Sequence, residues 1–394
     1  MSEPAKKPSG SMPGVQPESY NPKDAPELMK ALAEAQATPI PIKPYTVKIA
    51  NGGSYIDGVP ALRWGEWRDN TYIGCIAAAM EVLGEPVSYE TLMGVSGLCY
   101  RFAMKPDWCP SAAMAQVGTV WDDQIQGVTG IKQYSLASNS RRNKRVRQNL
   151  DAGIPVLGVG LTDAPEWHML TGYDDRAYFG RSYFDTQNTI PTSRYFNPDN
   201  NIFHTENNYR RAVHYPGEYP KGLLRFFDKP CKKAEPLALL KKSLEACLMY
   251  NAHGACGDTV FGEAAYRLLI EGLGKSDEVW AAFRRNENYH IGCLADARRC
   301  TYVYLRKSAA LLKGSSREKL LELAEGYQSI VDDILAVVPY EMLNEAFAFN
   351  GNSEEPWSME IRKGLVKALC KAMDVEKRIQ ADVKAILANW EDRK

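Results

Sequence analysis

The chain has 394 residues, in which 48 Lys and Arg balance 48 Asp and Glu, so its formal net charge is zero. A chain of this length usually holds about two to three domains, and 45% hydrophobic with 24% charged residues is ordinary for a globular protein. The balanced charge argues against nucleic-acid binding through a general basic surplus. No apolar run reaches the ~18 residues of a membrane-spanning helix, which argues against a membrane partner.

The first segment, residues 1–45, carries nine prolines. Proline fixes φ and lacks a backbone donor, so most of this segment is expected to be a tail or an arm, with one short helix at Pro26–Gln36. The segment also lacks the apolar core of a signal peptide, and we therefore expect a cytoplasmic protein.

Residues 46–230 mix helix and strand patterns, which predicts an α+β domain. Helices are expected at 75–83, from about Ser88, and at 143–152, ending at Gly153. Strands are expected at 45–49, 154–161, 168–173 and 178–185, with a hairpin turn at 174–176. The last part, 191–230, is rich in Asn, Tyr and Pro and predicts a long loop-bearing segment.

Residues 231–394 are dominated by helical periodicity and predict a helical domain packed on the first. Ser315-x-x-Glu318 has the pattern of a capping box, and Ser358 can cap the last helix. A Gly-rich stretch at 253–258 separates two further helices, and we expect the second to start at Asp258 or Thr259. His253 and Cys256 in this stretch are too few ligands for a zinc site.

Nine cysteines are present without any C-x-x-C pair, so neither a zinc ribbon nor a thioredoxin-like redox pair is expected. A thiol becomes a strong nucleophile where its thiolate is stabilised, for example at a helix N-terminus. Cys75 stands where a helix is expected to begin, after Gly74. Cys75 is therefore the candidate nucleophile, although a given cysteine is more often a buried core residue.

A nucleophilic cysteine needs a base, and the base needs a group that orients it. His168 opens one expected strand and Asp185 ends the next, so a hairpin would bring their side chains together. Trp108, Cys109 and Trp167 are candidates for the substrate pocket. Cys109 could also be a rival helix-opening thiol, but the segment is more typical of a turn that leads into a helix, with Trp108 packed on the domain or lining a pocket. Trp167 fits core packing equally well.

Two stretches of the chain resemble a known family. Residues 75–102 and 153–186 are similar to the butirosin-biosynthesis acyltransferase family, which is related to the C39-like branch of papain-fold cysteine peptidases. The likeness covers about residues 55–190. It is carried by a Gly-Ile-Pro-Val run, a His before Gly-Tyr-Asp, a later Asp, and the residues Cys75, Gly84, Ser88, Glu90, Gly94, Gly97, Leu98 and Tyr100.

The resemblance implies a papain-like (C39-like) cysteine-protease fold with an appended C-terminal helical domain. It also implies Cys75 as nucleophile, His168 as general acid and base, and Asp185 as its orienting group. Papain-like sites usually place a Gln about six residues before the Cys, where this chain has Asp69. Asn70 is the nearest amide that could serve as oxyanion-hole donor.

The first functional hypothesis is an acyltransferase that forms an amide bond, in which an acyl group on Cys75 passes to an amine in specialised peptide or natural-product biosynthesis. The acyl donor would be a peptide or a thioester on an acidic carrier protein, and no cofactor or metal is expected. The carrier would dock on a basic run that is otherwise a solvated helix face: Arg141, Arg142, Lys144, Arg145 and Arg147. The alternatives are a papain-like peptidase or amidase with the same triad and a catalytically inactive binding protein of this fold.

Overall fold

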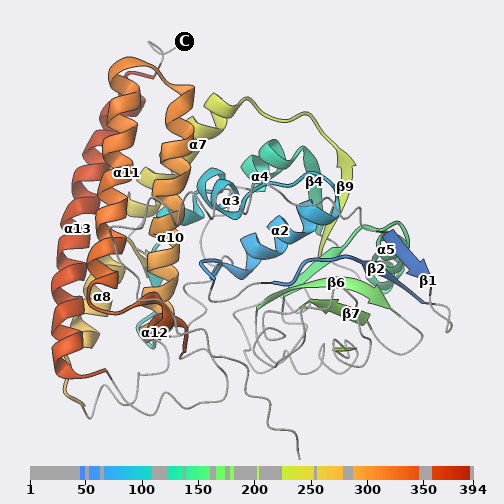
Figure 1. The fold of residues 1–394 in the computed structure, drawn as a ribbon, viewed down its shortest axis with the longest axis horizontal. Coiled ribbons are helices and arrows are strands. Elements are labelled where there is room, and N and C mark those ends of the chain that lie inside the picture. Colours follow the sequence, from blue (N-terminus) through green and yellow to red (C-terminus); the bar gives the residue numbers. More distant parts are fainter. Residues whose placement is uncertain are drawn as a thin grey trace, which may run out of the picture. The chain divides into compact units, whose positions relative to one another are not determined.

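The structure is a computed structural model, and it describes residues 45–48, 53–62, 66–108, 122–135, 139–159, 166–173, 178–181, 202–203, 224–252, 255–277, 287–345 and 357–390. All of them belong to one compact unit, Lys43–Lys394. The described residues form a mixed α+β fold with an antiparallel sheet (Figure 1). The expected helix at Pro26–Gln36 lies outside the described residues.

The larger sheet contains eight described strands, and every pairing in it is antiparallel. Its main path runs β1-β2-β6-β5-β9-β4, while β7 pairs with β6, and β8 with β7. The strands are β1 (Tyr45–Lys48), β2 (Ser54–Asp57), β4 (Ile131–Ser135), β5 (Val156–Val159), β6 (Trp167–Tyr173), β7 (Tyr178–Arg181), β8 (Ile202–Phe203) and β9 (Leu224–Pro230). Strand β5 is buried along its whole length, as the nearly continuous apolar run at 154–161 predicts for a central strand, and β6 is buried along its whole length as well.

The strand register defines two faces of this sheet, because residues paired directly across neighbouring strands share a face. Tyr134 pairs with Phe226, Phe226 with Val156, and Val156 with Leu170. Helix α5 (Asn139–Asp151) covers this face, since the Arg145 Nε donates to the Tyr134 hydroxyl at 2.6 Å. We call it the α5 face.

The opposite face carries Arg225, which pairs with Leu157, and Leu157 pairs with Met169. Helix α2 (Thr71–Val82) covers it, because the Arg225 guanidinium lies 5.4 Å from the ring centre of Tyr72. Trp167 belongs to the same face, and its ring centre lies 4.8 Å from that of Tyr72. We call this side the α2 face, and helix α4 (Asp122–Thr129) also contacts it through an ion pair between Arg225 and Asp122.

The helical part packs around α10 (Glu287–Ser308), which contacts α11 (Gly314–Leu335), α12 (Tyr340–Glu345) and α3 (Tyr89–Val95). Figure 1 shows α10, α11 and the long α13 (Met359–Ala388) side by side. The remaining described helical elements are α7 (Pro236–Ala252), α8 (Glu263–Leu273), η2 (Leu98–Tyr100) and η6 (Ala309–Leu311).

A second, three-stranded sheet joins the two sequence halves. Its strands are β3 (Ala103–Met104), β10 (Ala255–Cys256) and β11 (Thr259–Phe261), and β11 pairs with β3. The change of composition at residue 231 therefore does not divide the chain into two separate compact units.

Several local predictions are confirmed. Ser88 and Ser358 cap α3 and α13, and their hydroxyls accept from the amides of Thr91 and Ile361. The hairpin predicted around 174–176 is present as the antiparallel β6–β7 pair. Gly153 adopts a φ of +75° just beyond α5, the left-handed conformation that glycine accommodates after a helix.

Other local predictions are wrong in informative ways. The residue that caps α11 is Lys313, so Ser315 lies inside the helix rather than at its start. The helix expected at Asp258 or Thr259 begins at Glu263, because residues 255–261 form a hairpin. The segment 191–230 ends in strand β9, which is central to the sheet and which its Asn, Tyr and Pro content concealed.

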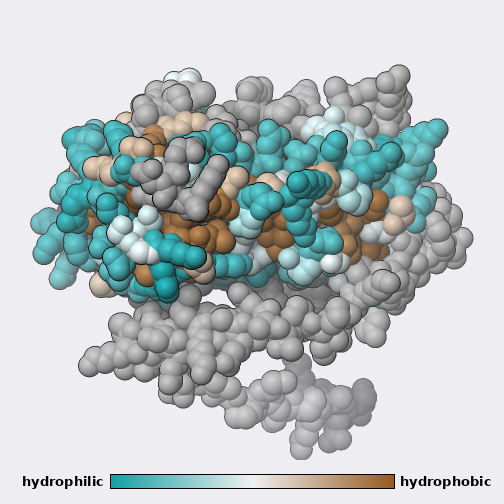
Figure 2. All heavy atoms as spheres, turned by 90° about the horizontal axis from the view of Figure 1, so that it is seen from above, coloured by the Kyte–Doolittle hydropathy of each residue, from teal (hydrophilic) through white to brown (hydrophobic). Residues whose placement is uncertain are grey.

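Seen from above, most of the described surface is hydrophilic, with apolar residues visible in patches between hydrophilic ones (Figure 2). Leu311 and Met342 are the large apolar side chains exposed among the described residues. No described helix combines the length and the apolar character needed to cross a membrane.

A buried ion pair ties α10 to α13, so truncating it should be costly. Arg298 and Glu376 are 0% and 4% exposed, and their side chains meet at 2.6 Å, with Tyr266 also donating to Glu376 at 2.7 Å. Glu376→Ala would leave the guanidinium buried without its counter-ion, and we expect a loss of about 3–5 kcal/mol in the free energy of unfolding. Urea unfolding monitored by circular dichroism measures it. Glu245→Ala, which removes the half-exposed partner of Lys242, is the control and should cost less than ~1 kcal/mol.

Candidate functional site

The helix that carries the candidate nucleophile begins four residues before Cys75. Asn70 is the N-cap of α2, and its side-chain oxygen accepts from the Ile73 amide at 3.1 Å. The first helical hydrogen bond already runs from Gly74 to Asn70. The backbone N–H of Cys75 therefore belongs to the hydrogen-bonded part of the helix. It is not one of the unpaired N–H groups at the helix N-terminus.

The thiol of Cys75 is sealed inside the protein. Its exposed fraction is 0%, and burial, followed by the negative charge of Glu166, raises its pKa well above the ordinary value. The helix N-terminus does not offset these effects because Cys75 lies in the second turn. The prediction that Cys75 opens the helix is therefore wrong, since α2 begins at Thr71, and burial favours the protonated thiol.

His168 lies on the other side of the sheet from Cys75. It pairs with Gly158 and alternates with Trp167 and Met169, which places its side chain on the α5 face. Its exposed fraction is 0%, its ring bonds to the backbone of Glu166, and burial lowers its pKa to about 4. The strand register thus separates the predicted base from the predicted nucleophile.

The carboxyl of Glu166 lies at the N-terminus of α2. The Thr71 hydroxyl donates to its carboxyl at 2.7 Å, and Thr71 and Cys75 share one face of α2 because they are four residues apart. Burial raises the pKa of Glu166 to about 7, partly offset by the Thr71 hydrogen bond. Perturbed buried groups of this kind gather at functional sites. The sequence analysis did not single out Glu166, although an acidic residue directly before an apolar strand is a signal that could have indicated it.

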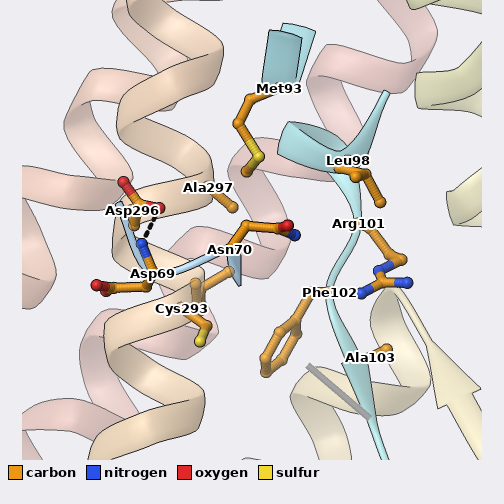
Figure 3. A pocket seen from close by; sticks show the side chains of 11 residues that line it. Asp69, Asn70, Met93, Leu98, Arg101, Phe102, Ala103, Cys293, Asp296 and Ala297 are labelled. Carbon is orange, nitrogen blue, oxygen red and sulfur yellow. Dashed lines mark hydrogen bonds between the residues drawn. The ribbon is translucent and has the colours of Figure 1, made fainter. Parts of the chain in front are cut away.

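The segment that leads into α2 is held by the helical part of the protein. Asp296 of α10 accepts from the Asp69 amide at 3.1 Å (Figure 3). Asp296 also accepts from the Tyr89 hydroxyl at 2.7 Å. Tyr340 donates to the Asp69 carboxyl and stacks on Trp67, with ring centres 3.5 Å apart. Trp67 has a φ of +59°, a strained conformation for this residue type that the surrounding contacts maintain.

A small cavity lies beside this segment, with about 20 Å³ of space for the centre of a water-sized sphere. Its lining includes Asn70, Phe102 and Cys293, and Figure 3 shows the Asn70 amide directed toward the side of the cavity formed by Arg101 and Phe102. Asn70 and Cys75 are five residues apart, so they occupy different faces of α2. The expected oxyanion hole of Asn70 and the Cys75 amide is therefore not formed.

The other pocket candidates have structural contacts. Trp108 is 2% exposed and packs against Gly272 of α8, while its carbonyl oxygen lies 3.2 Å from the Nε2 of His290. Trp167 is buried between β6 and Tyr72. Cys109 and Asp185 lie outside the described residues.

The basic run lies on α5, and part of it is engaged within the protein. Arg145 donates to Tyr134 and approaches Asp228, while the Arg147 guanidinium lies 5.0 Å from the ring centre of Tyr173. Lys144 is exposed. The side chains of Arg141 and Arg142 lie outside the described part of the structure.

Within the described residues, no three His, Cys, Asp or Glu side chains are arranged to hold a metal ion. No protein-family model matches the chain, and no curated protein matches it at a significant level. The site is therefore interpreted from its own geometry.

The pKa of Glu166 predicts a pH-dependent stability. Because the folded-state pKa is raised from 4.5 to about 7, its favourable contribution is present below pH 4.5 and is lost as the pH rises through 7. We expect Glu166→Gln to gain up to about 3 kcal/mol relative to the wild type between pH 5 and pH 8. Urea unfolding at both pH values measures the difference, and Glu245→Gln serves as control.

His168 acts in the opposite sense, since its lowered pKa costs stability as the pH falls from 6.5 through about 4. This effect is common to the wild type and Glu166→Gln, so it cancels in their comparison. An identical pH dependence in the two proteins would show that Glu166 titrates normally.

Proposed function

We propose that the chain is a catalytically inactive binding protein with a papain-like, C39-like fold. The observation that carries this proposal is the separation of Cys75 from His168 by the plane of the sheet, with both side chains fully buried. A thiol and an imidazole that do not face each other cannot exchange the proton that cysteine catalysis requires.

The papain-like part of the proposal rests on the order of the elements. A helix carrying Cys75 covers one face of an antiparallel sheet, and a later central strand carries His168. This order is that of the family which residues 75–102 and 153–186 resemble. The same arrangement with the pair separated favours a scaffold that has kept the fold without the chemistry.

The residues at the N-terminus of α2 also support a catalytically inactive protein. The N-cap position, which precedes the free amides of the helix, holds Asn70 rather than a thiol. The side chain that bonds to Thr71 at the N-terminus of α2 is that of Glu166, just before β6, rather than an imidazole. The N-cap of α2 and the position next to Thr71 are where a thiol–imidazole pair would be activated. Other polar groups, Asn70 and Glu166, occupy these two positions.

Cys75 should react slowly with a thiol reagent in the folded protein. We expect mild iodoacetamide treatment at pH 8 to label Cys75 at least about tenfold more slowly than the exposed Cys370, because the buried thiol remains protonated. Peptide mass spectrometry measures both rates, and the buried Cys247 is the matched control. Labelling of Cys75 faster than Cys370 would reveal an activated thiol and reject this proposal.

A second candidate is the cysteine-dependent acyltransferase of the resembled family, or the related amidase. One observation favours it: Glu166, with its raised pKa, lies close enough to Cys75 to influence the thiol. In this candidate Glu166 takes the proton of Cys75, whose sulfur attacks the acyl donor, and the donor's thiol or amine leaves with that proton as the Cys75 thioester forms. An amine then attacks the thioester, and the new amide is released as Cys75 regains its proton. An acidic carrier protein would dock on α5, where Lys144 is exposed.

An acyl-thioester assay separates this candidate from the first. The binding protein should release no more free acid than Cys75→Ala, with or without added amines. Amide product that depends on both Cys75 and Glu166, measured by mass spectrometry with Glu245→Gln as control, would establish the transferase. Equal yields of free acid with and without amines would identify a hydrolase instead.

A further inference from the structure

A pocket lies where α2 ends, with about 350 Å³ of space for the centre of a water-sized sphere. This volume falls within the ~300–1,000 Å³ that small-molecule sites occupy. Its lining comes from the ends of α2 and α4, from β4 and β9, and from the segments that follow α5 and β9. Helix α4 and strands β4 and β9 lie together in this region (Figure 1).

Part of the lining is apolar. Ile131 opens β4 and Phe227 belongs to β9, and their side chains are 8% and 1% exposed. Leu83, after α2, and Ile154, after α5, are half-buried and line the same pocket. An apolar ligand body placed against these side chains would remove apolar surface from water, which favours binding.

Three helices end at this pocket. The last residue of α2 is Val82, and its C-cap Leu83 lines the pocket. Helix α4 ends at Thr129, which also lines it, and Ile154 follows shortly after the end of α5 at Asp151. A helix C-terminus carries a partial negative charge of roughly half an elementary charge. The three helix ends therefore favour a cation in the pocket over an anion.

The charged side chains of the lining have the same preference. Glu85 and Asp228 contribute two carboxylates, and Lys233 contributes one ammonium group. Lys233 is paired with Glu85 at 2.8 Å. Asp228 is 41% exposed, and its contact with Arg145 of α5 is longer, at 3.9 Å. Asp228 therefore stands at the pocket as a carboxylate that can pair with a cationic ligand.

Lys233 illustrates how an alkylammonium group is accommodated at the end of α4. Gly130 has a φ of +73°, and a Cβ placed on it would lie 3.0 Å from the Cε of Lys233, so the lysine stem passes close to the backbone there. The segment is held by two hydrogen bonds, from the Cys231 amide to the Gly130 carbonyl at 2.7 Å and from the Ala234 amide to the Gly127 carbonyl at 2.8 Å. The protein thus already places an apolar stem with a cationic head beside this helix end.

We propose that this pocket binds a small organic cation, an amine with an apolar body. The body packs on Leu83, Ile131 and Phe227, and the ammonium group pairs with Asp228 near the three helix ends. The inference goes beyond the proposed function, because it assigns a ligand class to a site whose lining does not include Cys75 or His168.

The charge preference is tested with 2-phenylethylamine, which is protonated at pH 7. Its neutral and anionic counterparts are 2-phenylethanol and phenylacetate. We expect ligand-observed NMR to show saturable binding of the amine, at least about fivefold tighter than that of either counterpart. Absence of saturable amine binding, or binding of the alcohol or the anion at least as tight, would overturn the proposal.

A charge-removing variant locates the ammonium group. Asp228→Asn should weaken binding of the amine by about fivefold and leave binding of the alcohol unchanged, since it removes one charge at a half-exposed position. Asp382→Asn, at an exposed position of α13, is the matched control and should bind the amine like the wild type. Equal amine affinity in Asp228→Asn and the control would reject the role of Asp228 and with it the proposed site.

Cys231 reports the occupancy of the pocket without any substitution, because it lines the pocket and is half-exposed. Saturating 2-phenylethylamine should slow the labelling of Cys231 by iodoacetamide at least about threefold, because the bound ligand restricts access to the thiol. The exposed Cys370 is the internal control, and its labelling rate should not change. Labelling of Cys231 at the same rate with and without the amine would show that the amine binds elsewhere and would overturn the proposal.

Discussion

The register between β5 and β6 is the constraint on which the interpretation of the site depends. Because successive strand residues point to opposite faces, pairing His168 with Gly158 places Trp167 and Met169 against α2 and turns His168 toward α5. A register shifted by one residue would reverse both assignments. Both faces of β6 are buried, so a slip would force the close-packed side chains on each face to repack.

The second constraint is the carboxyl of Asp296, which fixes the start of α2 from the helical part of the protein. It binds the Asp69 amide and the Tyr89 hydroxyl, and that hydroxyl in turn accepts from the Asn70 amide. Burial raises the pKa of Asp296, while Arg299 opposes that shift. The helical part therefore positions the start of α2.

The sequence predicted the α+β class, the caps at Ser88 and Ser358 and the central apolar strand at 154–161, since these depend on local patterns. The position of Cys75 was misjudged because Gly74 suggested a turn into the helix, whereas the Asn70 cap starts it four residues earlier. The partnership of Cys75 with His168 depends on which face each strand residue occupies. A strand that is apolar on both faces gives no alternation from which to predict that face.

The polar groups on the α2 face were also beyond sequence reasoning, for a related reason. Gln133 and Arg225 come from two strands, and the strand that carries Arg225 lies at the end of a segment whose composition predicted a loop. Only the antiparallel pairing of β9 with β4 and β5 brings Gln133 and Arg225 to one face.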